Sequence, residues 1–132
     1  MTQPTNDEIV NQAPSRFFEA AGLRFTEVGG TRVRGEIHLG TEHHTPWGVV
    51  HGGVYTTAVE SAASLGASTA VADRGQIAVG VANSTDFIRP ISSGAVEVLA
   101  ERQSNRVEVS SCGRSPSPAP RTASWLPAVN CD

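Results

Sequence analysis

The stretch that runs from His51-Gly52-Gly53 to about Ala72 constrains the fold of this chain more than any other feature. Its interior consists mostly of Ala, Ser, Thr, Val and Gly. By intrinsic propensity this is a poor set of residues for a helix. Small side chains do, however, let a helix lie close against a sheet that curves around it. The stretch is therefore predicted to be a long central helix that is buried.

Strand patterns precede this helix. Residues 23–28 and 31–39 alternate, or nearly alternate, around Gly29-Gly30, a composition typical of a hairpin turn between two strands. One face of the second strand is expected to carry Val33, Gly35, Ile37 and Leu39. A short helix of one or two turns is predicted before the hairpin, at residues 16–21, and its Phe17 and Phe18 are expected to pack against the body of the protein.

Two further strands are predicted after the helix. They span residues 76–88 and 95–102, and the proline-containing segment 89–94 separates them. The predicted order is thus a short helix, two strands, the long helix and two strands. No internal repeat interrupts this order.

Length and composition indicate a single globular domain with surface that a partner subunit would cover, so an oligomer is expected. The formal net charge is −3, and no run of Lys and Arg alternates with aromatic residues, which argues against nucleic-acid binding. No apolar run approaches the roughly 20 residues of a membrane helix, so a cytoplasmic protein without membrane contact is expected. The spacing of Cys112 and Cys131 predicts neither a zinc site nor a redox motif.

The two ends of the chain differ from its middle. Residues 1–12 lack a sustained apolar pattern and are expected to form a flexible N-terminus, whereas residues 13–103 form the expected domain. Residues 104–132 carry several prolines among Ser and Arg, and no alternation extends beyond residues 107–109. This last segment is predicted to be a tail rather than part of the domain.

Chemistry is concentrated at the start of the predicted helix. Two glycines there leave backbone N–H groups uncovered, and the helix dipole adds positive potential, so an oxyanion forming at Gly52 would be stabilised. Glu60 lies in mid-helix among Ala, Val and Ser, where a carboxylate is costly unless it is paired or needed for function. Along a helix, Gly52 and Glu60 would lie roughly 12 Å apart, at about 1.5 Å per residue. If both act on one carbonyl, one of them comes from a second copy of the chain.

Each of these residues also has a simpler interpretation. His51, taken alone, would cap or pack at a helix start, and Glu60 would face solvent. Their common register with Gly52 and Gly53 favours the functional interpretation. Thr56 and Ser64, one turn on either side of Glu60, extend it into a narrow polar stripe.

Other polar residues are predicted to have no catalytic role. His43 and His44 suggest a metal site, but without a helical partner or a nearby set of Cys and carboxylates a solvated loop is favoured. His38 is predicted to lie on the surface of its strand. The helix serines are better explained by small-residue packing than by a nucleophile, because no Gly-x-Ser-x-Gly turn is present; they are Ser61, Ser64 and Ser68.

The run from about Leu23 to Glu101 resembles the PaaI-type branch of the hotdog-fold thioesterases. Three signals carry the resemblance, in the same order: the His-Gly-Gly loop, the acid Glu60 in the helix, and Asp-Phe-Ile-Arg-Pro at residues 86–90. The resemblance implies an α+β hotdog fold, in which a curved antiparallel β-sheet wraps around a long central α-helix. It also implies assembly as homodimers, and often as dimers of dimers, which are tetramers.

The resemblance implies a reaction as well, the hydrolysis of an acyl-CoA thioester. The amide of Gly52 would polarise the thioester carbonyl while His51 shapes the loop. Glu60 from the partner subunit would act either as nucleophile or as general base on water. CoA would be the leaving group, and neither a metal ion nor a further cofactor is expected.

The same resemblance implies a set of residues along the substrate. These expected substrate-binding residues are Thr45, Gly53, Ser64, Gly80, Asn83, Arg89, Ser92 and Gly94. Arg89, Ser92 and Gly94 resemble positions near the CoA nucleotide and pantetheine. Thr45 and Gly80 depart from the pattern, because many relatives carry Asn or Gln at the first position and some carry a water-positioning Ser or Thr at the second.

The largest departure lies at the end of the chain. Relatives continue after the strand at residues 96–102 with two more long strands, whereas this sequence continues with the Pro/Ser/Arg tail. A shifted reading frame or a truncation near residue 103 is one hypothesis, which intact-mass analysis and resequencing would test. These departures favour an alternative function, a catalytically silent hotdog module that binds acyl thioesters. The His-Gly-Gly context argues against a third possibility, a hotdog dehydratase or hydratase.

Overall fold

This computed structural model describes residues 16–76, 78–87, 89–103, 106–112 and 121–127. In chain order the elements are α2 (Arg16–Ala21), β1 (Leu23–Val28), β2 (Arg32–Leu39), the 3-10 turn η1 (Thr41–His43), α3 (Gly52–Val71), the 3-10 turn η2 (Ala72–Arg74), β3 (Ala78–Asn83), β4 (Gly94–Gln103), β5 (Arg106–Cys112) and β6 (Arg121–Pro127). Among the helices described here, none combines the length and apolar character needed to cross a membrane.

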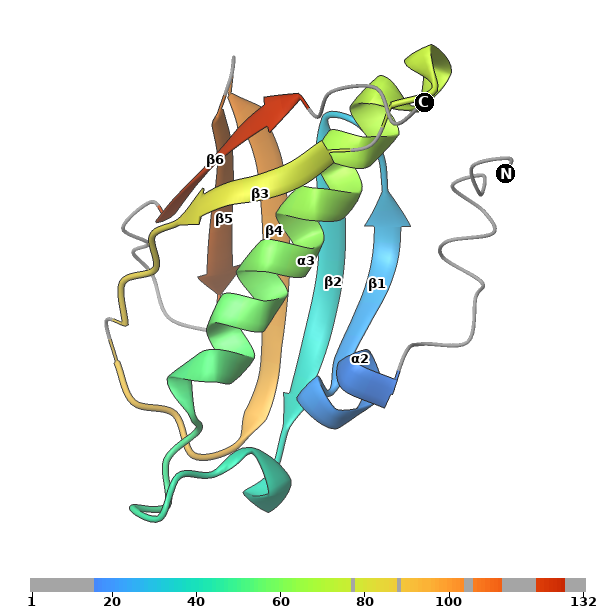
Figure 1. Cartoon of the computed structure of the whole chain (residues 1–132). Coiled ribbons are helices and arrows are strands. Elements are labelled where there is room, and N and C mark those ends of the chain that lie inside the picture. The colour runs from blue at the N-terminus through green and yellow to red at the C-terminus, as the bar shows by residue number, and fades with distance from the viewer. Residues whose placement is uncertain (1–15, 77, 88, 104–105, 113–120, 128–132) are drawn as a thin grey trace.

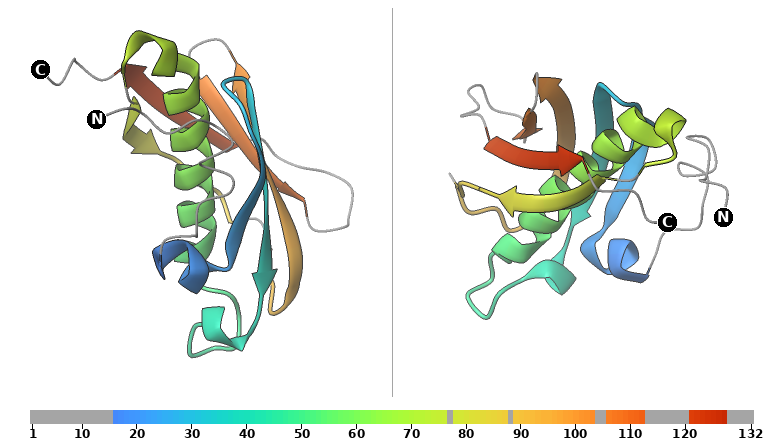
Figure 2. Two further views of the ribbon diagram at one scale, coloured as in Figure 1. Left: turned by 90° about the vertical axis from the view of Figure 1, so that its right-hand side faces the viewer. Right: turned by 45° about the horizontal axis from the view of Figure 1, so that its top comes forward.

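The strands form one antiparallel sheet in the order β1-β2-β4-β5-β6-β3. Leu23 pairs with Ile37 and Val28 with Val33, which confirms the predicted hairpin. The sheet curves, so that α3 contacts all six strands (Figures 1 and 2). This arrangement confirms the α+β hotdog fold that the sequence predicts.

One face of α3 forms the core together with β2 and β4. The buried residues of the helix are Ala58, Val59, Ala62 and Ala63. They pack in one cluster with alternate residues of the two strands, namely Val33, Ile37, Leu39, Val96, Val98 and Ala100. Burial alternates along β2, as predicted. The rest of α3 is only half-buried, so in the single chain the helix is covered on one face rather than on all sides.

Helix and sheet approach each other closely. A Cβ atom added to Gly30, in the hairpin turn, would lie 2.9 Å from the Cα atom of Ala70, and one added to Gly66 would lie 3.2 Å from a methyl group of Val33. Larger side chains would force these elements apart. The small residues of α3 therefore lower its intrinsic helix propensity but allow the helix and the sheet to pack closely. Ser68 adds a polar contact, since its hydroxyl accepts the N–H of Ala78 at 3.2 Å and so fixes the start of β3.

The opposite face of the β1–β2–β4 region is charged. Arg32 pairs with Glu101 at 2.9 Å, and Arg34 lies 3.5 Å from both Glu27 and Glu97. These side chains are all substantially exposed, so each pair contributes at most about 1 kcal/mol. The ion pairs therefore mark the solvated side of the sheet. His38 lies on the same side and is exposed, as predicted.

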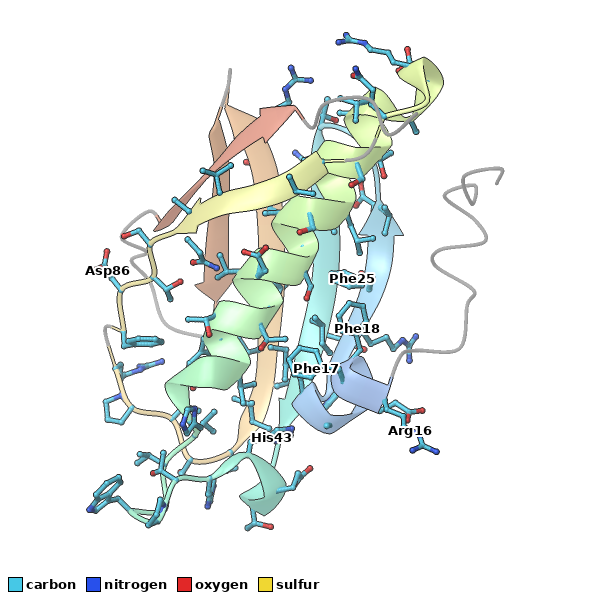
Figure 3. All side chains as sticks on the ribbon, in the orientation of Figure 1. Arg16, Phe17, Phe18, Phe25, His43 and Asp86 are labelled. Carbon is cyan, nitrogen blue, oxygen red and sulfur yellow. The ribbon has the colours of Figure 1, made fainter. Side chains whose placement is uncertain are left out.

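The short helix α2 packs through only one of its two aromatic residues. Phe18 meets Phe25 of β1 edge-on, with ring centroids 5.8 Å apart (Figure 3). Phe17 is 63% exposed. The prediction that both rings pack against the body is therefore right for Phe18 and wrong for Phe17, because successive residues of a helix point in different directions.

The second half of the sheet differs from the sequence-based expectation. The strand predicted at residues 76–88 is shorter, since β3 ends at Asn83 and residues 84–87 are irregular. Two strands, β5 and β6, lie in the segment that was predicted to be a tail. β5 forms a hairpin with β4, and β6 lies between β5 and β3, so each has backbone partners on both sides. The expectation for residues 1–12, and much of that for residues 104–132, falls outside the described residues.

Candidate active site

His51 caps the N-terminus of α3. Its backbone is extended, at φ −64° and ψ 132°, and its Nδ1 atom accepts the N–H of Gly53 at 2.8 Å. A Cβ atom on Gly53 would lie 2.9 Å from that same nitrogen, so glycine is what lets the imidazole come this close. The cap satisfies one of the free N–H groups of the first helical turn. Gly53, predicted to bind substrate, therefore has its amide hydrogen occupied by His51.

Gly52 is the first residue of α3, and its N–H differs from that of Gly53 in its hydrogen bonding. Within the described part of the chain, no acceptor pairs with it. The N–H thus remains available at the positive end of a helix of 20 residues. The ring of Phe87 lies beside it, because a Cβ atom on Gly52 would come within 3.0 Å of the ring. Phe87 also meets Tyr55, with ring centroids 6.2 Å apart.

The loop before α3 is held by His43, which is only 5% exposed. Its Nδ1 atom accepts the N–H of Gly40 at 3.0 Å, and its carbonyl oxygen accepts the N–H of His51 at 2.8 Å. The prediction of a solvated loop is wrong for His43, because its imidazole is buried against Gly22: a Cβ atom on Gly22 would lie 3.2 Å from two atoms of the ring. His43 therefore supports the residue that caps α3.

The same loop is joined to the segment before β4. The N–H of Val50 donates to the carbonyl oxygen of Ile91 at 2.8 Å, and the Nε2 atom of His44 lies 2.6 Å from the carbonyl oxygen of Ser92. His44 is half-buried, and its ring contacts the chain while the contact itself remains exposed to solvent. The contact brings the backbone of Ser92 beside the loop that carries His51.

Thr45, in contrast, faces its own loop. Its Oγ1 atom donates to the carbonyl oxygen of Val49 at 3.0 Å, and its N–H donates to the same oxygen at 2.7 Å. This tight turn leaves Trp47 at its tip, 84% exposed. The hydroxyl predicted to contact substrate is thus used to close the turn.

Glu60 lies farther along α3 and is half-buried beside the end of β3. Its Oε2 atom accepts from the Nδ2 atom of Asn83 at 3.4 Å, and the same nitrogen lies 3.4 Å from the carbonyl oxygen of Thr56. The hydroxyl of Thr85 donates to the Oδ1 atom of Asn83 at 2.8 Å. The structure therefore brings together two predicted site residues, Glu60 and Asn83. It adds Thr85, which sequence reasoning missed although its position two residues after Asn83 favours the same side of an extended chain.

The remaining predicted site residues lie on α3, on β3 and at or just before the start of β4. Ser64 is half-buried one turn beyond Glu60, and Gly80 is exposed on β3, where it pairs with Trp125. Arg89 is exposed in the segment before β4, and Gly94 begins β4 with φ 116°. Asp86, of the motif at residues 86–90, extends outward from the irregular segment after β3 (Figure 3). Among the residues with described side chains, no three His, Cys, Asp or Glu gather in a way that could hold a metal ion.

The sequence matches a protein family described as the Thioesterase superfamily over residues 48–108. This range includes the His51 cap, Gly52, Glu60 and the segment that carries Asn83 and Thr85. The matched region therefore contains both the start of α3 at Gly52 and the cluster of Glu60, Asn83 and Thr85.

Two curated relatives extend the comparison. The chain is 42% identical over 87 residues to "Putative esterase Rv1847" of Mycobacterium tuberculosis, a match that spans 64% of this chain and 62% of that protein. It is 33% identical over 98 residues to "1,4-dihydroxy-2-naphthoyl-CoA thioesterase 2" of Arabidopsis thaliana, which spans 74% of this chain and 59% of that protein. The matches thus span about three fifths of the length of these relatives.

A solved structure agrees over a larger share. The structure of the "putative esterase Rv1847/MT1895" from Mycobacterium tuberculosis superimposes with a TM-score of 0.78 and 33% sequence identity, covering 89% of this chain and 99% of that chain. The likeness therefore extends beyond the helix and its neighbouring strands to most of the fold.

Proposed function

This chain belongs to the thioesterase superfamily, and from that premise we propose that it hydrolyses an acyl-CoA thioester to the free acid and CoA. One observation carries the proposal more than any other. The N–H of Gly52 has no acceptor among the described residues and lies at the positive end of α3, while His51 occupies the neighbouring N–H of Gly53. A single donor is thus left where an oxyanion could be stabilised.

The proposed chemistry divides between two groups. The N–H of Gly52 polarises the thioester carbonyl and donates to the oxyanion as the carbonyl carbon becomes tetrahedral. Glu60 either attacks that carbon itself or removes a proton from the attacking water. The carbon–sulfur bond then breaks, and CoA leaves as the thiol. The curated thioesterase from Arabidopsis thaliana carries an acyl-CoA substrate in its name, which supports the choice of CoA as carrier.

We further propose that the two groups of one site come from two copies of the chain, in a homodimer or a dimer of dimers. Eight residues along one helix separate Gly52 from Glu60, or roughly 12 Å at about 1.5 Å per residue. A surface for the second copy is available at β3, the last strand in the sheet order, where Val79 and Val81 are 51% and 58% exposed. Among the described strands, β3 has a neighbour on one side only, and an edge strand with exposed apolar residues favours pairing with another chain.

The remaining assignments follow from the same proposal. Arg89, Ser92 and Gly94 would line the CoA nucleotide and pantetheine, and Ser64 and Gly80 would lie near the acyl group. The reaction needs no metal ion and no cofactor beyond the CoA of the substrate. A cytoplasmic location fits the supply of acyl-CoA.

The test is the release of free thiol from a panel of aryl and fatty acyl-CoAs. Glu60→Gln, which keeps the shape of the side chain but removes its charge, should lower kcat/KM by about two orders of magnitude or more. The matched control is Glu42→Gln, at an exposed carboxylate in η1, which should leave the rate unchanged. Equal rates for wild type and Glu60→Gln would contradict the proposal.

A silent binding module is the second candidate, and the turn at Thr45 favours it. The hydroxyl of Thr45 is occupied by the carbonyl of Val49, so one polar contact expected toward a substrate is missing. If the folded, dimeric wild type binds an acyl-CoA but releases no thiol from any member of the panel, this second function replaces the first.

A further inference from the structure

Asn83 occupies a junction between β3 and α3. It is the last residue of β3, and its Nδ2 atom lies 3.4 Å from the Oε2 atom of Glu60 and 3.4 Å from the carbonyl oxygen of Thr56. Its Oδ1 atom accepts the hydroxyl of Thr85 at 2.8 Å. The amide of this one side chain therefore meets three polar groups from two segments of the chain.

The orientation of the amide follows from the chemistry of its partners. A backbone carbonyl and a carboxylate only accept hydrogen bonds, so the side of Asn83 that faces Thr56 and Glu60 must be its NH₂ group. The reversed amide would place its oxygen against two other oxygens. The NH₂ group has two hydrogens, one for each acceptor, and the Thr85 hydroxyl satisfies the amide oxygen on the other side.

We propose that Asn83, oriented by Thr85, is a positioning residue that fixes the carboxylate of Glu60 for reaction. This inference rests on the proposed hydrolytic function of Glu60. The amide holds one carboxylate oxygen, Oε2, and leaves Oε1 for the substrate or the water. Because glutamate has several rotatable bonds, a fixed donor reduces the number of conformations in which the carboxylate misses its target.

A neutral donor suits this role. An Arg or Lys partner would form an ion pair and share the negative charge that Glu60 needs in order to attack or to accept a proton. Among the residues with described side chains, no ion pair reaches Glu60. The amide thus orients the carboxylate and leaves its charge in place.

This role differs from the substrate-binding role that the sequence predicts for Asn83. The Nδ2 atom of Asn83 lies within hydrogen-bond distance of two acceptors of the chain, so we expect its amide to orient Glu60 rather than to contact the substrate. A substrate contact would weaken binding when removed, whereas a positioning contact would slow the chemical step. The two roles therefore separate in kinetics as a change in KM against a change in kcat.

The kinetic test compares three variants with wild type. Asn83→Ala should lower kcat about tenfold with KM changed less than about twofold, because a hydrogen bond to a charged group is lost. Thr85→Val, which keeps the shape but removes the hydroxyl, should lower kcat roughly threefold. Ser84→Ala is the matched control, since Ser84 is exposed between the two, and it should match wild type.

The coupling to Glu60 provides a sharper criterion. In a Glu60→Ala background, Asn83→Ala should cause no further loss of kcat, because the group that it positions is absent. A tenfold loss in both backgrounds would show that Asn83 acts independently of Glu60 and would overturn the inference. A raised KM with unchanged kcat would also overturn it, in favour of substrate binding.

A second measurement tests the inference without an activity assay. The side-chain amide resonances of Asn83, assigned by their loss in Asn83→Ala, should shift in ¹⁵N–¹H spectra of Glu60→Gln and of Thr85→Val but not of Ser84→Ala. If these shifts occur but wild type releases no thiol, the proposed hydrolytic function is wrong. The contact between Asn83 and Glu60 would then be structural only, and the catalytic part of the inference would be overturned. Unchanged resonances would overturn it in full.

Discussion

At the scale of single residues, two adjacent glycines at the start of α3 have different roles. The N–H of Gly53 is held by the imidazole of His51, and the absence of a side chain at Gly53 allows that contact. The N–H of Gly52 has no such acceptor in the described residues, and the ring of Phe87 lies against its Cα atom. Gly53 therefore serves the cap, whereas Gly52 serves the proposed chemistry.

Two substitutions at Gly52 separate its N–H from its lack of a side chain. Gly52→Pro removes the N–H, and proline is tolerated at the first position of a helix when the preceding residue is extended, as His51 is. Gly52→Ala keeps the N–H and adds a Cβ atom at the same place, which crowds Phe87. We expect kcat of the proline variant to fall roughly 100-fold below that of the alanine variant, because one oxyanion donor is lost.

Steady-state kinetics with the acyl-CoA that reacts fastest would measure this difference. Circular dichroism of both variants is the control that α3 still forms. Equal kcat values for the two variants would mean that the N–H of Gly52 does not stabilise the oxyanion.

At the scale of elements, the short distance between α3 and the sheet explains the composition of the helix. Ala62 and Ala63 are fully buried, and the hairpin turn at Gly30 approaches Ala70 closely. A helix of Leu and Ile would gain apolar area but would have to move away from the sheet. Close packing at this interface also positions Glu60 beside Asn83, so the core and the site share one helix.

A larger side chain in this interface should therefore destabilise the protein. Ala62→Leu adds three carbon atoms to a position with no exposed surface, and overpacking of this kind costs about 1–3 kcal/mol of unfolding free energy. Ala95→Leu makes the same change at an exposed position of β4 and should stay within about 0.5 kcal/mol. Urea denaturation would measure the free energy of unfolding of both variants. Equal values would show that the interface can accommodate the larger side chain.

The same scale shows what could be predicted from the sequence. The hairpin was predictable because apolar residues such as Val33 and Ile37 alternate along β2, and α3 was predictable from its run of small residues. Both signals are local in the sequence. β5 and β6 were not predictable, because their segment has little apolar alternation, and the position of β6 also depends on its pairing with β3, which lies far away in the sequence. At the site, the motif indicates Gly52 and Glu60. It gives no indication that Asn83 turns toward the helix, since a contact across 23 positions depends on the register of β3.

At the scale of the whole molecule, a single chain holds the two halves of the proposed site apart. Gly52 begins α3, while Glu60 lies two turns later beside Asn83. The exposed valines at β3 and the half-buried outer side of α3 are surfaces that a second copy would cover. A dimer with a twofold axis would create two equivalent sites, because each copy supplies to its partner what it receives.

Subunit mixing tests this arrangement directly. Gly52→Pro and Glu60→Ala are each expected to be nearly inactive. In a mixed dimer, one site combines the proline with the alanine, while the other combines the intact Gly52 of one copy with the intact Glu60 of its partner. Random reassociation of equal amounts makes half of the dimers mixed, so about a quarter of wild-type activity should return. If both groups of a site came from one chain, each mixed dimer would contain two damaged sites, and mixing would restore nothing.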